Sequence, residues 1–316
     1  MPEAPLVVVA DPIDPSAIER LKAGPCRVLD ASGDPKNLAP QLADAWALVV
    51  RSRTKVNADL LRSAPRLGLI ARAGVGVDNV DMKTAGERGI RVVNAPAAAT
   101  ASVAELSVAL YLLLVRGLLP AIVATKAGTW ERSGHGHELA GKTVGFVGYG
   151  RIAREVARRL EPFGTPTIAY DPYVTAPVDR TELVPWEDLL RRSDIVSIHA
   201  ALTSENRHLL DARAFGAMKP GAFLVNVARG PLVDEAALLS GLKSGRIGGA
   251  ALDVFEVEPP TNRELLELPN VVATPHIGAM TSEGQGRAGA EIVDEVLRAL
   301  RGEPLTSLVP APGAAK

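Results

Sequence analysis

The chain has 316 residues, 47% of them apolar and 22% charged, a composition that excludes a disordered polypeptide and predicts about two globular domains. A formal net charge of −1 gives no electrostatic footprint for nucleic acid or a membrane surface, so a small molecule is the predicted partner. The single cysteine, Cys26, excludes an intramolecular disulfide, and an N-terminus without a basic signal-like region favours a cytoplasmic location.

Short apolar runs alternate with amphipathic segments over the first 94 residues. Strands are predicted at residues 6–10, 26–29, 47–50, 67–71 and 90–94. This alternation is typical of βαβ units whose strands form a parallel sheet buried on both faces.

Residues 97–128 break this rhythm and predict a long helix that is interrupted near Pro120. Its longest apolar stretch, from Leu106 to Val115, has about half of the length that spans a bilayer. We therefore expect this helix to be buried all round, either in the core or in a subunit interface.

The alternation of strands and helices resumes after residue 141. Strands are predicted at residues 142–148, 167–171, 194–200, 222–228, 248–254 and 270–276. They indicate a second, independent doubly wound parallel sheet. A helical period over residues 281–302 follows, with no later strand except one at 304–309, and we expect this helix to cross back onto the first domain.

A glycine-rich motif follows the first strand of the second sheet. It reads Gly148-Tyr149-Gly150-Arg151-Ile152-Ala153. Gly148 permits a tight turn, Gly150 lets backbone approach a pyrophosphate, and Ala153 lets the helix pack closely on the strand. Asp171 ends the next strand about 20 residues later, where a carboxylate accepts hydrogen bonds from an adenosine ribose and repels a 2′-phosphate. The motif predicts NAD rather than NADP, with a plain turn residue as the alternative role of Asp171.

Three polar residues, Arg229, Glu258 and His276, follow the last three predicted strands. Carboxyl ends of parallel strands meet at one edge of a sheet, where ligands bind, so we expect these side chains to lie close together. Hydride transfer to a 2-oxo acid needs a cation for the carboxylate, a proton donor, and a carboxylate that orients the donor. The alternatives are an Arg229–Asp234 ion pair, a surface acid at Glu258 and a core imidazole at His276.

These residues lie within motifs that resemble the D-isomer-specific 2-hydroxyacid dehydrogenase family, most closely its phosphoglycerate dehydrogenase branch. Besides the glycine-rich motif, the matching segments are VRSRTKV (50–56), ARAGVGVDNVD (71–81), WERSG (130–134), SDIVSIH (193–199), MKPGAFLVNVARGPLVDE (218–235), DVFEVEPP (253–260) and TPHIGA (274–279). The resemblance implies an α/β fold with two doubly wound parallel-sheet domains. A Rossmann NAD-binding domain, residues 99–283, is inserted into a flavodoxin-like substrate-binding domain formed by residues 1–98 and 284–316.

The resemblance also implies a role for each candidate catalytic residue. His276 is the acid/base, Arg229 orients the substrate, and Glu258 is the carboxylate partner of the histidine. Glu256 competes for that last role, but the family pattern places the acid immediately before Pro-Pro, which selects Glu258.

The implied cofactor contacts extend beyond the glycine-rich motif. Asp253 is expected to contact the nicotinamide amide, and the backbone at Val75 and Gly76 to cradle the substrate carboxylate. The complete predicted cofactor-binding set is Val75, Gly148, Gly150, Arg151, Ile152, Asp171, Ala200, Val227, Ala228, Asp253 and Gly278.

The arginines indicate a phosphorylated substrate, because a guanidinium group can donate two parallel hydrogen bonds to a phosphate. Arg51, Arg72 and Arg132 match positions that hold phosphate in the phosphoglycerate branch, the last reaching over from a partner subunit. The alternative for each is a solvated side chain. The segment Ala97-Ala98-Ala99 departs from the Asn-Gly-Asn stretch of that branch and removes hydrogen-bonding capacity.

The remaining histidines give weaker signals. His135 and His137, with Glu138, could form a metal clip, but no third group of ligands is evident, so a loop is favoured and no metal is predicted. His199 matches an H-x-P pattern of the family in which Ala201 replaces the proline.

The sequence predicts an NAD-dependent D-2-hydroxyacid dehydrogenase that converts D-3-phosphoglycerate to 3-phosphohydroxypyruvate in serine biosynthesis. A hydroxypyruvate or glyoxylate reductase, or a dehydrogenase of another anionic 2-hydroxy acid, is the alternative within the family. An NAD-sensing corepressor-type binding protein is the alternative outside enzymes. The family habit implies a homodimer through helix 101–119, and the chain end at Lys316 predicts a short form without a serine-binding regulatory domain.

Overall fold

The computed structural model describes residues 3–34, 37–130, 132, 136–176 and 179–310. The chain divides into two compact units. Unit 1 comprises Met1–Thr100 and Ala279–Lys316, and unit 2 comprises Ala101–Gly278. The units therefore change at 100/101 and 278/279, where the sequence predicts boundaries at 98/99 and 283/284.

Unit 1 contains a five-stranded parallel sheet in the order β2-β1-β3-β4-β5, which is the flavodoxin-like order. The strands are β1 (Leu6–Val9), β2 (Arg27–Asp30), β3 (Ala45–Val50), β4 (Leu69–Arg72) and β5 (Arg91–Asn94). All five predicted strands of the first half are confirmed, with bounds that differ by a few residues.

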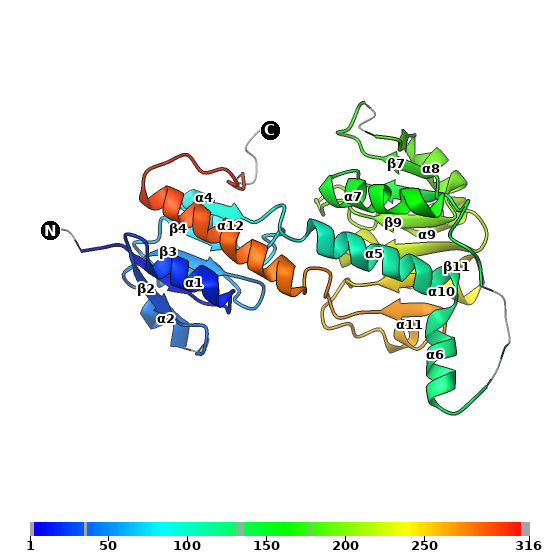
Figure 1. Ribbon diagram of the computed structural model, residues 1–316, viewed down its shortest axis with the longest axis horizontal. Coiled ribbons are helices and arrows are strands. Elements are labelled where there is room, and N and C mark those ends of the chain that lie inside the picture. The colour runs from blue at the N-terminus through cyan, green and yellow to red at the C-terminus, as the bar shows by residue number, and fades with distance from the viewer. Residues whose placement is uncertain (1–2, 35–36, 131, 133–135, 177–178, 311–316) are drawn as a thin grey trace. The chain divides into compact units, whose positions relative to one another are not determined.

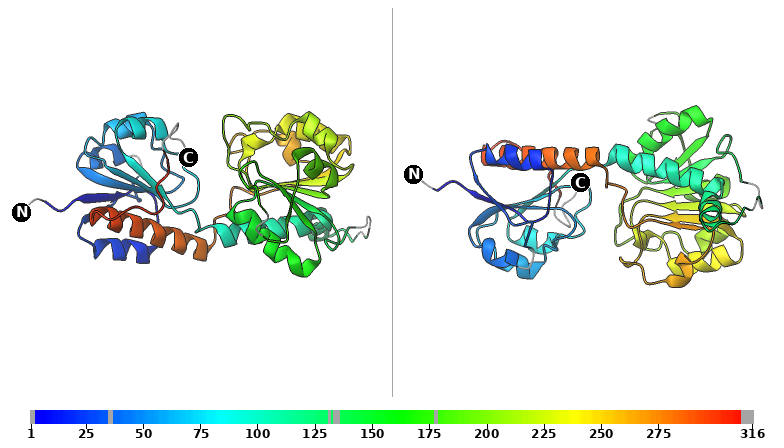
Figure 2. Two further views of the ribbon diagram at one scale, coloured as in Figure 1. Left: turned by 90° about the horizontal axis from the view of Figure 1, so that it is seen from above. Right: turned by 60° about the horizontal axis from the view of Figure 1, so that its bottom comes forward.

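Helices cover both faces of this sheet (Figure 2). One face carries α1 (Pro15–Lys22) and α12 (Ser282–Leu300), and the other carries α2 (Leu38–Gln41), α3 (Ala58–Arg62) and α4 (Met82–Glu87). The predicted return of the last helix onto the first domain is confirmed, because Ile292, Val293 and Val296 of α12 are buried with Leu21 of α1. Figure 1 shows α12 lying along α1. After α12, Leu308 makes an isolated antiparallel bridge to Val93.

Unit 2 contains a seven-stranded parallel sheet in the order β12-β11-β10-β9-β6-β7-β8. The strands are β6 (Val144–Val147), β7 (Thr167–Tyr170), β8 (Glu182–Leu183), β9 (Ile195–Ile198), β10 (Ala222–Asn226), β11 (Ile247–Leu252) and β12 (Val271–Ala273). This is the Rossmann order, in which the winding reverses between β6 and β9. The six predicted strands are confirmed, and only the two-residue β8 was not predicted.

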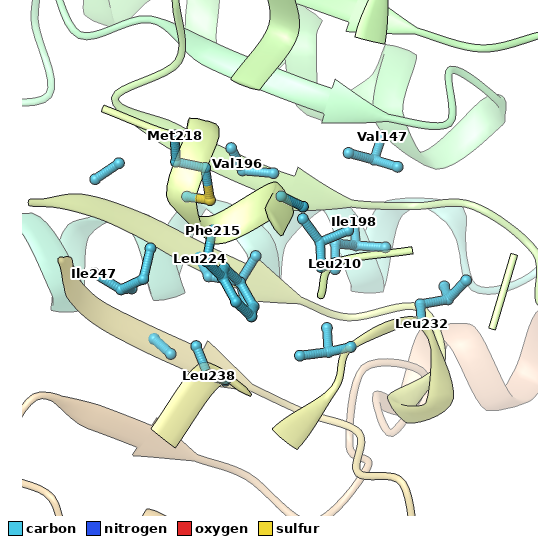
Figure 3. Close-up of a cluster of buried hydrophobic side chains, with 14 of the residues drawn as sticks. Val147, Val196, Ile198, Leu210, Phe215, Met218, Leu224, Leu232, Leu238 and Ile247 are labelled. Carbon is cyan, nitrogen blue, oxygen red and sulfur yellow. The ribbon is translucent and has the colours of Figure 1, made fainter. Parts of the chain in front are cut away.

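Helices also cover both faces of the second sheet. One face carries α5 (Thr100–Val115) and α7 (Arg151–Leu160), and the other carries α8 (Trp186–Arg192), α9 (Ala212–Ala217), α10 (Glu235–Lys243) and α11 (Arg263–Leu266). Figure 3 shows the core of the second face, where Val196 and Leu224 from the strands pack with Phe215 and Leu238 from the helices. Because side chains of a buried parallel sheet are apolar on both faces, they hold the strand ends, and the loops that follow them, in fixed positions.

The predicted helix over residues 97–128 is two helices, α5 and α6 (Leu118–Lys126), which are bent by 74° (Figure 1). The break lies at Gly117, which has a φ of +56°, rather than at Pro120. Pro120 lies in the first turn of α6, where a missing N–H costs no helical hydrogen bond. Among the described residues no single helix is long and apolar enough to cross a membrane, although α5 and α6 pass that test when taken together across their bend.

Candidate active site

The carboxyl edge of the unit 2 sheet collects most of the predicted site residues. Since the strands are parallel, the loops that follow them emerge at this one edge. Arg151 and Ile152 begin α7 after β6, Ala200 follows β9, Val227 and Ala228 follow β10, and Gly278 follows β12. The three candidate catalytic residues come from the loops after β10, β11 and β12.

The glycine-rich loop has the backbone that a bound pyrophosphate requires. Gly148 has a φ of +86°, and a Cβ there would lie 2.7 Å from the Cα atom of Ala200, so only glycine fits between β6 and β9. Gly150 is the N-cap of α7, supplies no side-chain acceptor, and has open space where a Cβ would lie. The N–H groups of the first turn of α7 are thus left for an anion, and the buried Ala153 packs the helix on the sheet.

Asp171 ties this loop to the turn after β7. Its Oδ2 atom accepts a hydrogen bond of 2.8 Å from Tyr149 N, and its Oδ1 atom accepts one of 2.9 Å from Tyr173 N. An ionised carboxylate has about four acceptor positions, so both oxygens keep capacity for ribose hydroxyls. The geometry therefore accommodates both the turn role and the ribose role of Asp171.

Tyr149 adds a contact that the sequence did not indicate. Its side chain is fully buried, and its hydroxyl lies 2.6–2.7 Å from the carboxylate oxygens of Asp179 and 2.6 Å from Thr181 Oγ1. Burial raises the pKa of Tyr149, and the hydrogen bond to Asp179 adds to that rise. Burial alone would raise the pKa of Asp179, but hydrogen bonds from Tyr149 and Thr181 outweigh it and lower the pKa. The residue between the two glycines thus fastens the loop to the segment before β8.

His276 and Glu258 form a direct pair. The distance from His276 Nδ1 to Glu258 Oε2 is 2.9 Å, and the side chains are 51% and 40% exposed, so a ligand can reach them. Phe255 N donates to the other carboxylate oxygen of Glu258 at 3.2 Å. When Nδ1 carries the proton that Glu258 accepts, the neutral ring offers Nε2 as a proton acceptor.

Asp253 holds the loop that carries His276. It is 1% exposed and accepts hydrogen bonds from Thr274 Oγ1 at 2.6 Å and from the N–H groups of Ile277 and Gly278, both at 2.8 Å. The backbone carbonyl of Asp253 also accepts from His276 N at 2.9 Å. His276 has a φ of +54°, a conformation that this network retains. The sequence suggested a cofactor contact for Asp253 and gave no indication of this loop-organising role.

Arg229 lies in the turn after β10, which is built around Asn226. The buried Asn226 side chain donates to Arg229 O at 2.9 Å and accepts from Ala228 N at 3.0 Å, while Arg229 Nη1 donates to Ala228 O at 2.7 Å. Gly230 follows, and a Cβ there would lie 1.8 Å from the carbonyl carbon of Phe255. Only glycine lets this turn rest directly on the segment that leads to Glu258.

Glu256, the competitor of Glu258, has other partners. His208 Nε2 lies 2.8 Å and Arg207 Nη2 lies 2.9 Å from Glu256 Oε2, and Glu235 N donates to Oε1 at 3.1 Å. Burial alone would raise the pKa of Glu256, but these hydrogen bonds and the charges of His208 and Arg207 lower it overall. The structure thus brings Glu258, and not Glu256, to the His276 ring.

Two predicted substrate residues of unit 1 lie at the carboxyl ends of neighbouring strands: Arg51 follows β3, and Arg72 is the last residue of β4. Arg51 is half-buried, and its guanidinium lies 3.2 Å from Pro12 O and 3.5 Å from Met280 Sδ. A Cβ at Gly74 would lie 1.7 Å from Arg72 Nη1, so the guanidinium of Arg72 lies over Gly74.

The backbone cradle expected at Val75 and Gly76 is held by Asn94. The Asn94 side chain donates to Val75 O at 2.5 Å, and Ala95 N donates to Gly74 O at 2.9 Å. The loop after β4 is therefore fastened to the end of β5.

The remaining predicted residues lie apart from the His276–Glu258 pair or outside the residues that the structure describes. Burial lowers the pKa of His199 to about 3, so its ring is neutral, and its Nε2 lies 2.9 Å from Ser197 Oγ. Arg132 is exposed, and His135 lies outside the described residues. Within the described ranges no group of three His, Cys, Asp or Glu side chains could hold a metal ion.

Comparison with known proteins gives a consistent result. Residues 108–278 match the family model described as D-isomer specific 2-hydroxyacid dehydrogenase, NAD binding domain. The chain is 44% identical to a D-3-phosphoglycerate dehydrogenase of Methanocaldococcus jannaschii, covering 97% of this chain but 59% of that relative. It is also 44% identical to a hydroxypyruvate reductase of Thermotoga maritima, covering 93% of this chain and 98% of that relative. A glyoxylate reductase structure from Paecilomyes thermophila superposes with a TM-score of 0.89 at 30% identity, over 98% of this chain and 99% of that one.

Proposed function

The chain belongs to the D-isomer specific 2-hydroxyacid dehydrogenase family, and from this membership we propose that it transfers a hydride between NAD and a D-2-hydroxy acid. The observation that carries the proposal is the His276–Glu258 pair, 2.9 Å apart, at the carboxyl edge of a sheet with the Rossmann order. An acid/base with an oriented carboxylate at that edge is the group that alcohol oxidation next to a nicotinamide requires.

The glycine-rich loop and Asp171 fit NAD. The backbone at Gly148 and Gly150 and the first turn of α7 would hold the pyrophosphate, and Asp171 would accept from the adenosine ribose. The other proposed contacts with NAD are those predicted from the sequence, at Val75, Arg151, Ile152, Ala200, Val227, Ala228, Asp253 and Gly278. When bound, NAD accepts the hydride that leaves the carbon of the substrate.

His276 would take the proton in the same reaction. In the oxidation, Nε2 of His276 accepts the proton of the substrate hydroxyl, and the ring becomes a cation that Glu258 stabilises through Nδ1. In the reduction, the same nitrogen returns the proton to the carbonyl oxygen. Arg229 would hold the substrate carboxylate and polarise the carbonyl, with backbone N–H groups at Val75 and Gly76 as further donors.

We propose D-3-phosphoglycerate as the substrate, with 3-phosphohydroxypyruvate as the product. Arg51 and Arg72 support this proposal, because they lie at the carboxyl ends of neighbouring strands, β3 and β4, and supply the guanidinium groups that a phosphate prefers. Arg132 from a partner subunit would be a third cation. The phosphoglycerate dehydrogenase relative supports the same substrate, although the chain spans 59% of its length.

Reduction of hydroxypyruvate or glyoxylate is the second candidate. It is supported by the hydroxypyruvate reductase relative, of which this chain spans 98%, and by the three alanines at residues 97–99 in place of polar residues. Neither substrate carries a phosphate, so the arginines would then have no anion beyond the carboxylate to bind.

A panel of 2-hydroxy acids with NAD, and of the corresponding 2-oxo acids with NADH, followed by absorbance at 340 nm, tests the proposal. We expect turnover of D-3-phosphoglycerate with a higher kcat/KM than D-glycerate. Faster turnover of glycerate would reject the phosphate assignment, and no turnover of any acid, in either direction, would reject the dehydrogenase.

We also propose that the protein is a homodimer that pairs through the helix over residues 101–119 and its continuation, α6. One side of α5 is buried in unit 2, whereas α6 has no buried residue although most of its side chains are apolar. Ile122 and Val123 are 48% and 58% exposed, and a second copy would cover them.

A further inference from the structure

Two histidines share an uncommon backbone conformation. Among the described residues, His208 and His276 are the non-glycine residues with a positive φ, and both have a φ of +54°. This left-handed region is unfavourable for a residue with a Cβ atom, so it marks side chains that the surroundings hold in place. Each ring bonds a glutamate, and the two glutamates, Glu256 and Glu258, are two positions apart. The His208–Glu256 pair is therefore attached to the segment that supplies Glu258, the partner of His276.

Glu256 fastens that segment to two other parts of unit 2. Its side chain is 20% exposed, and its Oε2 atom lies 2.8 Å from His208 Nε2. Its Oε1 atom accepts from Glu235 N at 3.1 Å, and its own N–H donates to Glu235 Oε1 at 2.7 Å, which joins it to the start of α10. Because the pKa of Glu256 is lowered, its carboxylate is ionised near neutral pH and the His208 ring must be the donor.

The segment has little freedom to compensate if this attachment is lost. On one side the Gly230 backbone rests directly on Phe255 and Glu256. Within the segment, Phe255 N donates to Glu258 Oε1 at 3.2 Å, which aims Oε2 of Glu258 at His276. A displacement of Glu256 would therefore move the oxygen that orients the His276 ring.

We propose that His208, acting through Glu256, is a positioning residue for the His276–Glu258 pair. The hydrogen bond from His208 Nε2 to Glu256 Oε2 fixes the segment over residues 255–258 and keeps the proton of the neutral His276 ring on Nδ1. The consequence for turnover rests on the proposed function, whereas the consequence for the His276 ring does not. Arg207 bonds the same oxygen, but its side chain is 55% exposed, and exposed ion pairs contribute little.

Three variants separate this role from a general effect on folding. His208→Ala removes the ring, His208→Gln retains an N–H donor of similar reach, and Arg207→Ala removes the exposed partner as a matched control. Long-range proton–nitrogen NMR spectra resolve the five histidines, and His276 is assigned by the loss of its signals in His276→Gln. NADH binding by fluorescence reports whether each variant is folded.

We expect the neutral His276 ring to carry its proton on Nδ1 in the wild type and in Arg207→Ala. In His208→Ala we expect a mixture of the two neutral forms of the His276 ring and a kcat about tenfold lower, with an unchanged NADH dissociation constant. In His208→Gln we expect the wild-type ring form and the wild-type kcat to return. If His208→Ala binds no NADH, Glu256→Leu, which removes both acceptor oxygens, is expected to give the same mixture.

The proposal is overturned if His208→Ala keeps the wild-type ring form and kcat, if Arg207→Ala loses as much as His208→Ala, or if His208→Gln restores nothing. Absence of 2-hydroxy acid turnover in the wild type would reject the proposed function alone. The ring form of His276 would still decide the role of His208.

Discussion

Asp171 serves the local fold and the proposed cofactor with one carboxylate. It accepts from Tyr149 N and Tyr173 N, and in the proposed function its negative charge would disfavour a 2′-phosphate. Asp171→Ala is expected to weaken NAD binding about tenfold while NADP binding stays the same or improves, as titration of tryptophan fluorescence would measure. Equal weakening of both cofactors would mean that only the turn role of Asp171 matters.

Gly230 occupies a position that has no room for a Cβ atom. A Cβ atom at this position would lie 1.8 Å from the carbonyl carbon and 1.9 Å from the carbonyl oxygen of Phe255, both of which belong to the backbone and cannot rotate away. Gly230→Ala is therefore expected to lower the free energy of unfolding by at least about 2 kcal/mol, as measured by urea denaturation.

Gly216 in α9 provides the control for that substitution. A Cβ there would meet no atom within 4 Å, so Gly216→Ala is expected to raise the free energy of unfolding by about 0.5–1 kcal/mol. Equal stabilities of the two variants would contradict the close approach at Gly230.

At the scale of elements, the strands were the most predictable part of the chain. Apolar runs such as residues 222–228 end close to where β10 ends, because burial on both faces demands continuous apolar residues. The sequence predicts the break in the long helix near Pro120, since proline is the usual interruption. The structure places it at Gly117, because only the tertiary fold decides where a left-handed residue is needed.

The loops at the carboxyl edge were predictable in their residues but not in their connections. Arg229, Glu258 and His276 could be selected from the sequence because their types match a reaction and their positions follow strands. The bonds that hold the surrounding loops come from Asn226, Asp253 and Glu256, whose partners lie in other loops or on the far side of a turn. Such partners depend on the order of the strands in the sheet, which local sequence does not contain.

The apolar surface of α6 belongs to the same scale and predicts an assembly. Ile122→Glu is expected to convert the proposed dimer to a monomer, because a charge cannot be buried without a partner. Light scattering after gel filtration measures the mass. Phe163→Glu, a matched change at another exposed apolar residue of unit 2, is expected to leave the mass unchanged. A dimeric Ile122→Glu protein would show that pairing does not involve this surface.

For the whole molecule, the chain builds one unit from both of its ends and the other from its middle. The α12 residues Ile292, Val293 and Val296 fill the core of unit 1 although the first segment of that unit, Met1–Thr100, ends nearly 200 residues earlier in the sequence. The sequence allowed this to be predicted only because no strand follows the last helix in a position to form a third sheet. The NAD-binding family model lies entirely within unit 2, in agreement with the placement of the glycine-rich loop.

In the proposed reaction, His276, paired with Glu258, carries the proton in an NAD-dependent oxidation of a 2-hydroxy acid. The most direct test compares the initial rate of NADH formation by the wild type and by His276→Gln, at saturating NAD and with the best acid of the panel. The variant is expected to have a kcat lower by roughly 10²–10⁴ with unchanged NADH binding, because only the proton transfer is removed. A His276→Gln protein that forms NADH at the wild-type rate would contradict this role of His276.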